Sequence, residues 1–198
     1  MKTWMDLYDY YLPDVPGCPY ATGAQALRIA AQEFCERTSA WRVTMDPVLT
    51  VAGISIYEFD ISSNFEVVKV MSAKLDGHPI DSLLHDQVGT PARGIAVLNG
   101  REFALQPAPA AGQRLEIVAV LKPSNTSVGI EDFLYAAHAR AIAKGAKAEL
   151  FGMAKQGFTD LTAADRARAE FEEAIGRAKT QAAQAYSNAP LRTKPSFL

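Results

Sequence analysis

Hydrophobic residues recur every three or four positions over two successive stretches within residues 130–186. In the first stretch nearly all of the repeating residues are small, and in the second they lie opposite a strongly charged side. This spacing predicts two amphipathic helices, and small contact faces allow two such helices to approach closely as an antiparallel hairpin. The first face consists of Ile130, Leu134, Ala137, Ala141, Gly145 and Ala148, and the second of Ala164, Ala167, Phe171, Ala174, Ala178, Ala182 and Ala185.

The residues at the ends of these stretches fit helix termini. Glu131 and Asp132 supply negative charge where the first helix should begin, and Gly152 follows its last apolar position. Either Asp160 or Thr162 can cap the second helix. Acidic residues and short polar caps stabilise helix N-termini, and glycine favours C-termini.

A third helical pattern precedes this pair. Apolar or small residues alternate at spacings of four and three, which predicts an amphipathic helix over residues 24–41 with Trp41 as its anchor. Thr22 followed by Gln25 resembles a capping box at its start. The periodic positions are Leu27, Ala31, Phe34, Thr38 and Trp41.

The hydrophobic period changes between residues 43 and 122. Short runs rich in β-branched and aromatic residues are separated by turn signals, notably Asp76-Gly77 and Asn99-Gly100, dipeptides that tolerate the positive φ angles of tight hairpins. We therefore expect an antiparallel β-domain. Its predicted strands cover residues 48–51, 54–59, 66–75, 94–98, 102–106 and 114–121.

The two chain ends have a different composition. Residues 1–20 are rich in aromatics and prolines and predict a short helical turn within an extended arm, packed either on its own domain or on a neighbouring subunit. Residues 187–198 cannot continue a helix because they contain Pro190 and Pro195. This tail is either a frayed terminus or a docking segment, and its apolar end, Phe197-Leu198, favours docking.

These patterns predict an α+β fold, in which an N-terminal helix and a long C-terminal helical hairpin form a helical bundle with an inserted antiparallel β-domain. The expected divisions are an arm and first helix (1–42), the β-domain (43–122), the helical hairpin (123–186) and an extended C-terminal tail (187–198). Residues 122–129 are expected to be a polar linker back to the helices.

Composition narrows the class of protein. A chain of 198 residues with 48% hydrophobic and 21% charged residues is typical of a globular protein that needs neither metal nor disulfide for stability. Cys18 and Cys35 show no metal or redox spacing, so we expect free thiols in a reducing compartment. No apolar run is long enough to span a membrane, and Asp6 and Asp9 argue against a signal peptide, which predicts synthesis in the cytoplasm without membrane association.

Catalytic motifs are missing from the sequence. It contains no phosphate-binding loop, dinucleotide fingerprint or nucleophile elbow, and His78, His85 and His138 are too scattered to form a metal site. We therefore expect no catalytic, cofactor or metal site. A net charge of −2 disfavours a nucleic-acid regulator, which would show salt-sensitive DNA binding. The remaining alternative is an enzyme or small-ligand-binding protein with an unrecognised site in the β-domain.

Two helical stretches resemble a known family. Residues 26–42 (ALRIAAQEFCERTSAWR) look like the first helix of bacteriophage head-to-tail adaptor proteins of the tail tubular protein A type. Residues 141–150 (AIAKGAKAEL), followed by 158–160 and 169–172, are similar to the helical hairpin of that family. Family members often place proline and tryptophan in the hairpin turn, where this chain has Ala154 and Phe158.

The resemblance implies a structural virion protein of the connector or neck, without enzymatic activity or a cofactor. About a dozen copies would form a ring beneath the portal protein, because heterologous contacts between copies close into rings. The β-domain would face tail or nozzle proteins, and DNA would pass through the lumen without specific binding. Assembly would occur in the host cytoplasm. The expected portal contacts are Leu191, Arg192, Lys194, Phe197 and Leu198, and the expected inter-subunit contacts are Trp4, Tyr8, Arg166, Glu173 and Arg177.

Overall fold

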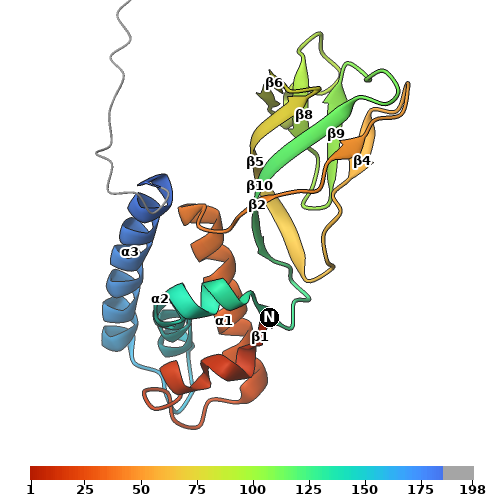
Figure 1. The fold of residues 1–198 in the computed structure, drawn as a ribbon. Coiled ribbons are helices and arrows are strands. Elements are labelled where there is room, and N and C mark those ends of the chain that lie inside the picture. Colours follow the sequence, from red (N-terminus) through yellow and green to blue (C-terminus); the bar gives the residue numbers. More distant parts are fainter. Residues whose placement is uncertain (185–198) are drawn as a thin grey trace, which may run out of the picture.

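The computed structural model describes residues 1–184 and has a mixed α+β fold, which confirms the α+β part of the predicted fold class. Helix α1 precedes nearly all of the strands, and helices α2 and α3 follow them. Figure 1 shows the helices gathered in one part of the molecule and most strands in another. The described helices are η1 (Trp4–Tyr10), α1 (Tyr20–Thr38), η2 (His85–Gln87), α2 (Asp132–Gly152) and α3 (Leu161–Gln184).

Helix α1 begins and ends earlier than the hydrophobic pattern predicts. Pro19 is the N-cap, in an extended conformation, so Thr22 lies inside the helix and the predicted capping box is wrong. At the other end Ser39 adopts a left-handed conformation with φ 53°. Trp41 therefore lies beyond the helix, yet its side chain is buried, as expected for an anchor.

Helix α2 is buried on a broader face than its predicted stripe. Ala137 is exposed and Ala141 is half-buried, whereas Ile142 and Ala146 are fully buried. The reason is that α2 contacts α1 as well as α3, so two sides of the helix are covered. Ile130 is buried in a short strand, outside the helix. Gly152 ends α2, as predicted.

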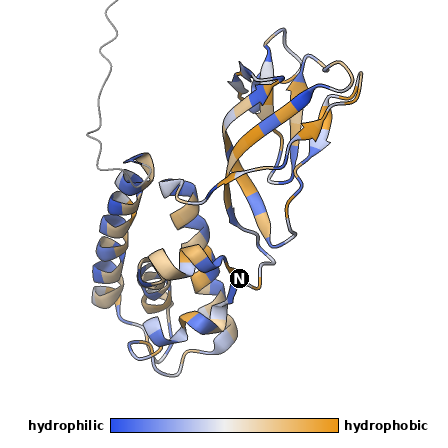
Figure 2. Cartoon of the chain, in the orientation of Figure 1, coloured by the Kyte–Doolittle hydropathy of each residue, from blue (hydrophilic) through white to orange (hydrophobic). Residues whose placement is uncertain are grey.

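Helix α3 follows its predicted face closely. Ala167, Phe171, Ala174 and Ala178 are buried together with Ile175, whereas the opposite side is polar, as the colouring in Figure 2 shows. The Oδ1 atom of Asp160 accepts a 2.9 Å hydrogen bond from the backbone amide of Ala163. Of the two predicted caps, Asp160 is therefore the one that the helix uses.

The strands form three sheets within the described residues. Strand order is β1-β11 in the first, β2-β10-β5-β6 in the second, where β3 also pairs with β10, and β4-β9-β8-β7 in the third. All pairs are antiparallel except β7 with β8, which the sequence did not predict. The strands are β1 (Lys2–Thr3), β2 (Arg42–Thr44), β3 (Val48–Leu49), β4 (Ile56–Glu58), β5 (Phe65–Leu75), β6 (His78–Ile80), β7 (Ser82–Leu83), β8 (Gly94–Val97), β9 (Glu102–Gln106), β10 (Arg114–Pro123) and β11 (Gly129–Ile130).

Only one of the two predicted tight turns uses positive φ angles. Asp76 and Gly77, with φ of 49° and 79°, connect β5 to β6 as predicted. Asn99 and Gly100 are not among the residues with positive φ, so that part of the prediction is wrong. Asn99 acts instead through its side chain, whose Oδ1 atom accepts hydrogen bonds from the backbone amides of Arg101 (2.8 Å) and Glu102 (2.9 Å).

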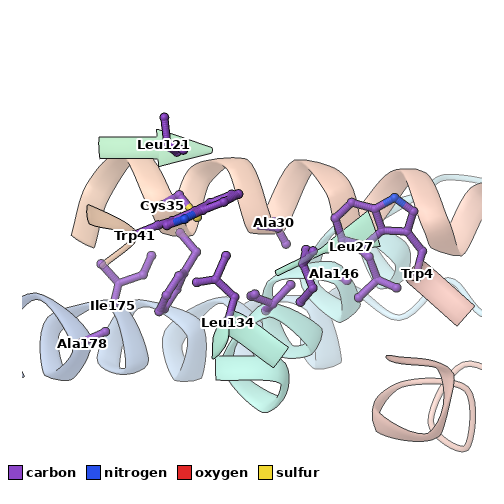
Figure 3. Packing of buried hydrophobic residues seen from close by; sticks show 14 of the residues in the cluster. Trp4, Leu27, Ala30, Cys35, Trp41, Leu121, Leu134, Ala146, Ile175 and Ala178 are labelled. Atoms are coloured by element: carbon purple, nitrogen blue, oxygen red, sulfur yellow. The ribbon is translucent and has the colours of Figure 1, made fainter. Parts of the chain in front are cut away.

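A continuous hydrophobic core joins the helices to the end of the central strands. Figure 3 shows Trp41 and Cys35 between β10 and the helices below them. The Trp41 ring makes edge contacts with Phe65 of β5 (4.7 Å between centroids) and Phe133 of α2 (6.0 Å). One buried indole therefore contacts both parts of the molecule. Both cysteines are buried free thiols, and burial raises the pKa of Cys35.

Gly145 marks the closest approach within the helical part. A Cβ atom at this position would lie 2.9 Å from the Cβ of Ala30 on α1 and 2.9 Å from the Phe171 ring on α3. Real Cβ atoms do not approach other carbon atoms so closely, so any side chain would push α2 away from one of its partners. Helix α2 therefore needs glycine where the two partner helices meet it.

We predict that Gly145→Ala lowers the free energy of unfolding by about 1–3 kcal/mol, the usual cost of overpacking a close-packed core. Gly176→Ala is the matched control, because Gly176 lies in α3 with nothing within 4 Å of the added Cβ. That substitution should stabilise the protein by about 0.5–1 kcal/mol through helix propensity. Chemical denaturation measures both. Equal effects of the two substitutions would contradict the close approach at Gly145.

Candidate interaction surfaces

The N-terminal arm lies on its own chain. Strand β1 pairs with β11, and the side chains of Leu7, Tyr11 and Val15 are fully buried. Trp4 is 2% exposed, and its Nε1 atom donates a 2.9 Å hydrogen bond to the carbonyl oxygen of Ser127. The sequence left open whether the arm packs on its own domain or on a neighbouring subunit. The structure shows it packed on its own domain.

Trp4 also helps to hold the segment that returns from the strands to the helices. The Arg28 guanidinium lies 6.0 Å from the Trp4 ring and donates a 3.1 Å hydrogen bond to the same Ser127 carbonyl. The Nε2 atom of Gln32 donates to the carbonyl oxygen of Pro123 at 3.0 Å. The predicted polar linker is therefore bound to α1, and β10 extends into it as far as Pro123.

Tyr8 belongs to a cluster of tyrosines within the arm itself. Its ring makes edge contacts with Tyr11 (5.4 Å) and Tyr20 (5.2 Å), and burial raises the pKa of both Tyr8 and Tyr11. Gly23 allows this packing, because a Cβ at that position would overlap the Tyr11 hydroxyl. Trp4 and Tyr8 thus already have partners within their own chain, and their inter-subunit role remains a prediction.

The charged residues predicted for inter-subunit contact lie on the outer side of α3. Arg166 pairs with Glu170 at 3.3 Å, and Arg177 pairs with Glu173 at 3.0 Å, both at a spacing of one helical turn. The side chains of Arg177 and Glu173 are 66% and 65% exposed, so this ion pair leaves most of their surface accessible. Exposed pairs of this kind contribute little to stability. These three residues are therefore accessible to a neighbouring molecule.

Other charges on α3, which the sequence analysis did not single out, tie that helix to α1. Arg168 donates two 2.9 Å hydrogen bonds to the two carboxylate oxygens of Glu33. Arg37 donates to Glu33 at 2.8 Å and to Glu172 at 2.6 Å, and the hydrogen bond from Arg37 lowers the pKa of Glu172. The partners that join α1 to α3 are distant in sequence, so periodicity alone gave no signal for them. These ion pairs therefore bind this side of α3 to α1 of the same chain.

Two adjoining hollows, of about 300 and 380 Å³, border α2 and α3 and share His138, Ala178 and Gln181, and the first is also lined by Ala40 and Arg42. The His138 ring lies 4.8 Å from the Phe34 ring, and burial lowers the pKa of His138. Among residues 1–184 no group of three histidine, cysteine or acidic side chains is placed to bind a metal ion. The structure thus places His138, one of the three scattered histidines, as a buried packing residue.

The predicted portal contacts, Leu191, Arg192, Lys194, Phe197 and Leu198, lie outside the described residues. Their role stays a prediction. Among the described helices, none is long and apolar enough to cross a membrane.

A comparison with models of known protein families identifies a family for this chain. The family model described as SU10 adaptor protein matches residues 3–194, and so covers both the helical and the β part of the chain. No curated protein matches.

We predict that Trp4→Ala lowers the free energy of unfolding by about 3–5 kcal/mol, as expected for truncation of a buried tryptophan. Met5→Ala is the matched control on the same turn, because Met5 is 59% exposed, and it should change stability by less than about 0.5 kcal/mol. Thermal or chemical denaturation measures the difference. If Trp4→Ala left stability unchanged but impaired assembly, Trp4 would belong to an interface between subunits.

Proposed function

The chain belongs to the SU10 adaptor protein family, and we propose that it is the head-to-tail adaptor of a bacteriophage, forming a ring beneath the portal and joining it to the tail. Membership of this family implies a structural virion protein that contacts other virion components, such as the portal and the tail, and has no enzymatic role. The match from residue 3 to residue 194 is the observation that carries the proposal.

A ring of copies requires contact surfaces that a single chain leaves open. The outer side of α3 supplies one, with Arg166, Glu173 and Arg177 accessible and only weakly engaged. Heterologous contacts of this kind close into a ring when the rotation between copies permits it. We propose about a dozen copies, by analogy with adaptors of the tail tubular protein A type. Each copy would place its helical bundle around the ring.

The proposed ring surrounds the path of the DNA without binding the DNA tightly. A protein that binds DNA tightly neutralises phosphates with a basic surface, whereas this chain has a net charge of −2. The proposed adaptor therefore lets the genome pass through its lumen during ejection. It would be assembled in the host cytoplasm and remain at the head-tail junction of the virion.

The proposed contacts at the two ends of the adaptor come from different parts of the chain. Residues 1–42 and 123–186 would form the helical domain nearer the portal, and residues 43–122 would form the β-domain that meets tail or nozzle proteins. The contacts of α1 with both α2 and α3 support this division. The tail, residues 187–198, would reach the portal through Leu191, Arg192, Lys194, Phe197 and Leu198.

An enzyme or small-ligand binder with its site in the β part is the competing function. A hollow of about 380 Å³ lies there, between the ends of β6, β8 and β9 and the loop after β9. Its lining includes the side chain of Gln106, which donates hydrogen bonds to the carbonyl oxygens of Thr90 and Ala92 and so braces a loop of its own chain. That arrangement favours a structural role for this region.

We predict that the purified protein forms rings on isolated portal rings, with light scattering and negative-stain imaging as the measurements. Deletion of residues 187–198 should abolish portal binding without changing the melting temperature. A second variant that replaces these residues with a glycine-serine segment of equal length should also fail to bind, because the proposed contact depends on side chains.

A protein that remains monomeric and ignores portals would contradict the adaptor proposal. A large drop in melting temperature after the deletion would show instead that residues 187–198 belong to the core.

A further inference from the structure

The end of the β part carries an uncharged, exposed apolar surface. Residues 47–57, between Asp46 and Glu58, contain no charged side chain. Within this stretch four aliphatic side chains are about half exposed or more: Leu49 (66%), Val51 (52%), Ile54 (46%) and Ile56 (56%). Isolated exposed apolar residues are ordinary, but four within eight residues are not. We call these four residues the β4 patch.

The β4 patch is held in a fixed shape. A tight turn places Val51 next to Ile54, with a 3.2 Å hydrogen bond from the Ile54 amide to the Val51 carbonyl and with Gly53 at φ 77°. The Tyr57 hydroxyl accepts a 3.1 Å hydrogen bond from the Val51 amide. Thr50 anchors the turn to the neighbouring loop, because its amide donates to the Gln113 carbonyl at 2.9 Å. Apolar side chains on such a braced turn are presented to a partner at little cost in entropy.

Strand β4 is also an outer strand of its sheet, next to β9. The Ser55 carbonyl accepts a hydrogen bond from the Leu105 amide, and the Phe59 amide donates to the Arg101 carbonyl, so these residues face β9. Because backbone groups alternate along an antiparallel strand, the amides and carbonyls of Ile56 and Glu58 face away from the sheet. An outer strand with free backbone groups and exposed aliphatic side chains is suited to pair with another chain.

The opposite edge of the same four-stranded sheet carries a second apolar surface. The sheet runs β4-β9-β8-β7, and Leu84, directly after β7, is 68% exposed, with Val88 37% exposed nearby. This segment is braced too, since the Oε1 atom of Gln87 accepts a 2.9 Å hydrogen bond from the Leu84 amide. We call Leu84 and Val88 the β7 patch. One subunit thus has two apolar patches at opposite edges of one sheet.

We propose that the β4 patch of one copy packs against the β7 patch of the next copy, so that the β parts form a continuous ring of their own. A heterologous contact between identical chains joins two different surfaces, so each chain must carry both patches. A single external partner would need only one patch on each chain. The absence of charged side chains from residues 47–57 means that no like charges meet there. This inference rests on the proposed adaptor ring and names a contact that closes it.

The size of the patches indicates how this contact works. Four half-exposed aliphatic side chains present on the order of 300 Å² of apolar surface, enough to be functional but well below the roughly 800 Å² per partner of a standard stable interface. The contact is therefore too small to hold two free chains together. It forms when copies are already aligned side by side, as they would be on a portal.

The inference can be tested by cross-linking rings assembled on portal rings, using the full-length chain. Ile56→Cys combined with Leu84→Cys, treated with a short bis-maleimide, should give a ladder of covalent oligomers. The native thiols, Cys18 and Cys35, are buried and do not compete. Ile56→Cys combined with Val128→Cys is the matched control, because Val128 is also 56% exposed but lies outside both patches. This control should give no ladder.

Two lysine variants supply an independent measurement. Ile56→Lys and Leu84→Lys should each weaken ring completion on the portal by about tenfold or more, the usual loss for a buried interface side chain, while Val128→Lys has no effect. All three should keep the melting temperature of the wild type, because the replaced side chains are exposed.

Three outcomes would overturn the inference while leaving the adaptor function intact. The first is wild-type rings in which the cysteine pair gives no ladder, and the second is complete rings with both lysine variants. In the third, Ile56→Cys alone yields covalent dimers, which would mean that like edges pair with each other. Failure of the wild type to assemble on portals would instead contradict the proposed function itself.

Discussion

The close packing of α2 between α1 and α3 is the constraint on which the helical part depends. Gly145 lies where both partner helices approach α2, and no other residue leaves room for Ala30 on one side and Phe171 on the other. Helices that approach so closely need little aromatic volume between them, which is why alanines suffice over most of the buried faces. The bidentate ion pair between Arg168 and Glu33 then fixes α3 against α1 at the surface. These contacts hold the three helices together and leave the charged outer side of α3 accessible.

A second set of contacts links the helices to the strands. Trp41 lies between β5 and α2, and Trp4 holds the returning segment at Ser127. Both indoles are buried within their own chain, so the orientation of the β part relative to the helices is set before any assembly takes place. For an adaptor this matters, because a ring built from pre-oriented subunits loses less conformational entropy on assembly than one built from flexible subunits. The structure therefore supports a subunit that assembles largely as a preformed body.

The hydrophobic pattern predicted the long elements well, because each has enough periodic positions to identify its exposed and buried sides. The six predicted strands and three long helices are present, and Asp160 and Gly152 mark helix ends as expected. Short strands such as β7 and β11 were missed, since two residues carry no periodicity. The start of α1 was misplaced because Pro19 caps it through its backbone conformation rather than a side chain. Exposure was the least predictable property: a periodic pattern does not reveal that Ile56 lies on a strand at the edge of its sheet, or that Ile54 is exposed in the turn before it.

The central claim is that copies of this chain form the ring between the portal and the tail. Cryo-electron microscopy of the head-tail junction in intact virions tests it most directly, because it locates the protein in its native assembly. The account predicts a symmetric ring directly beneath the portal, into which the fold of residues 1–184 fits once per subunit around an open channel. A junction whose density is fully explained by other chains, with no ring of this fold, would contradict it.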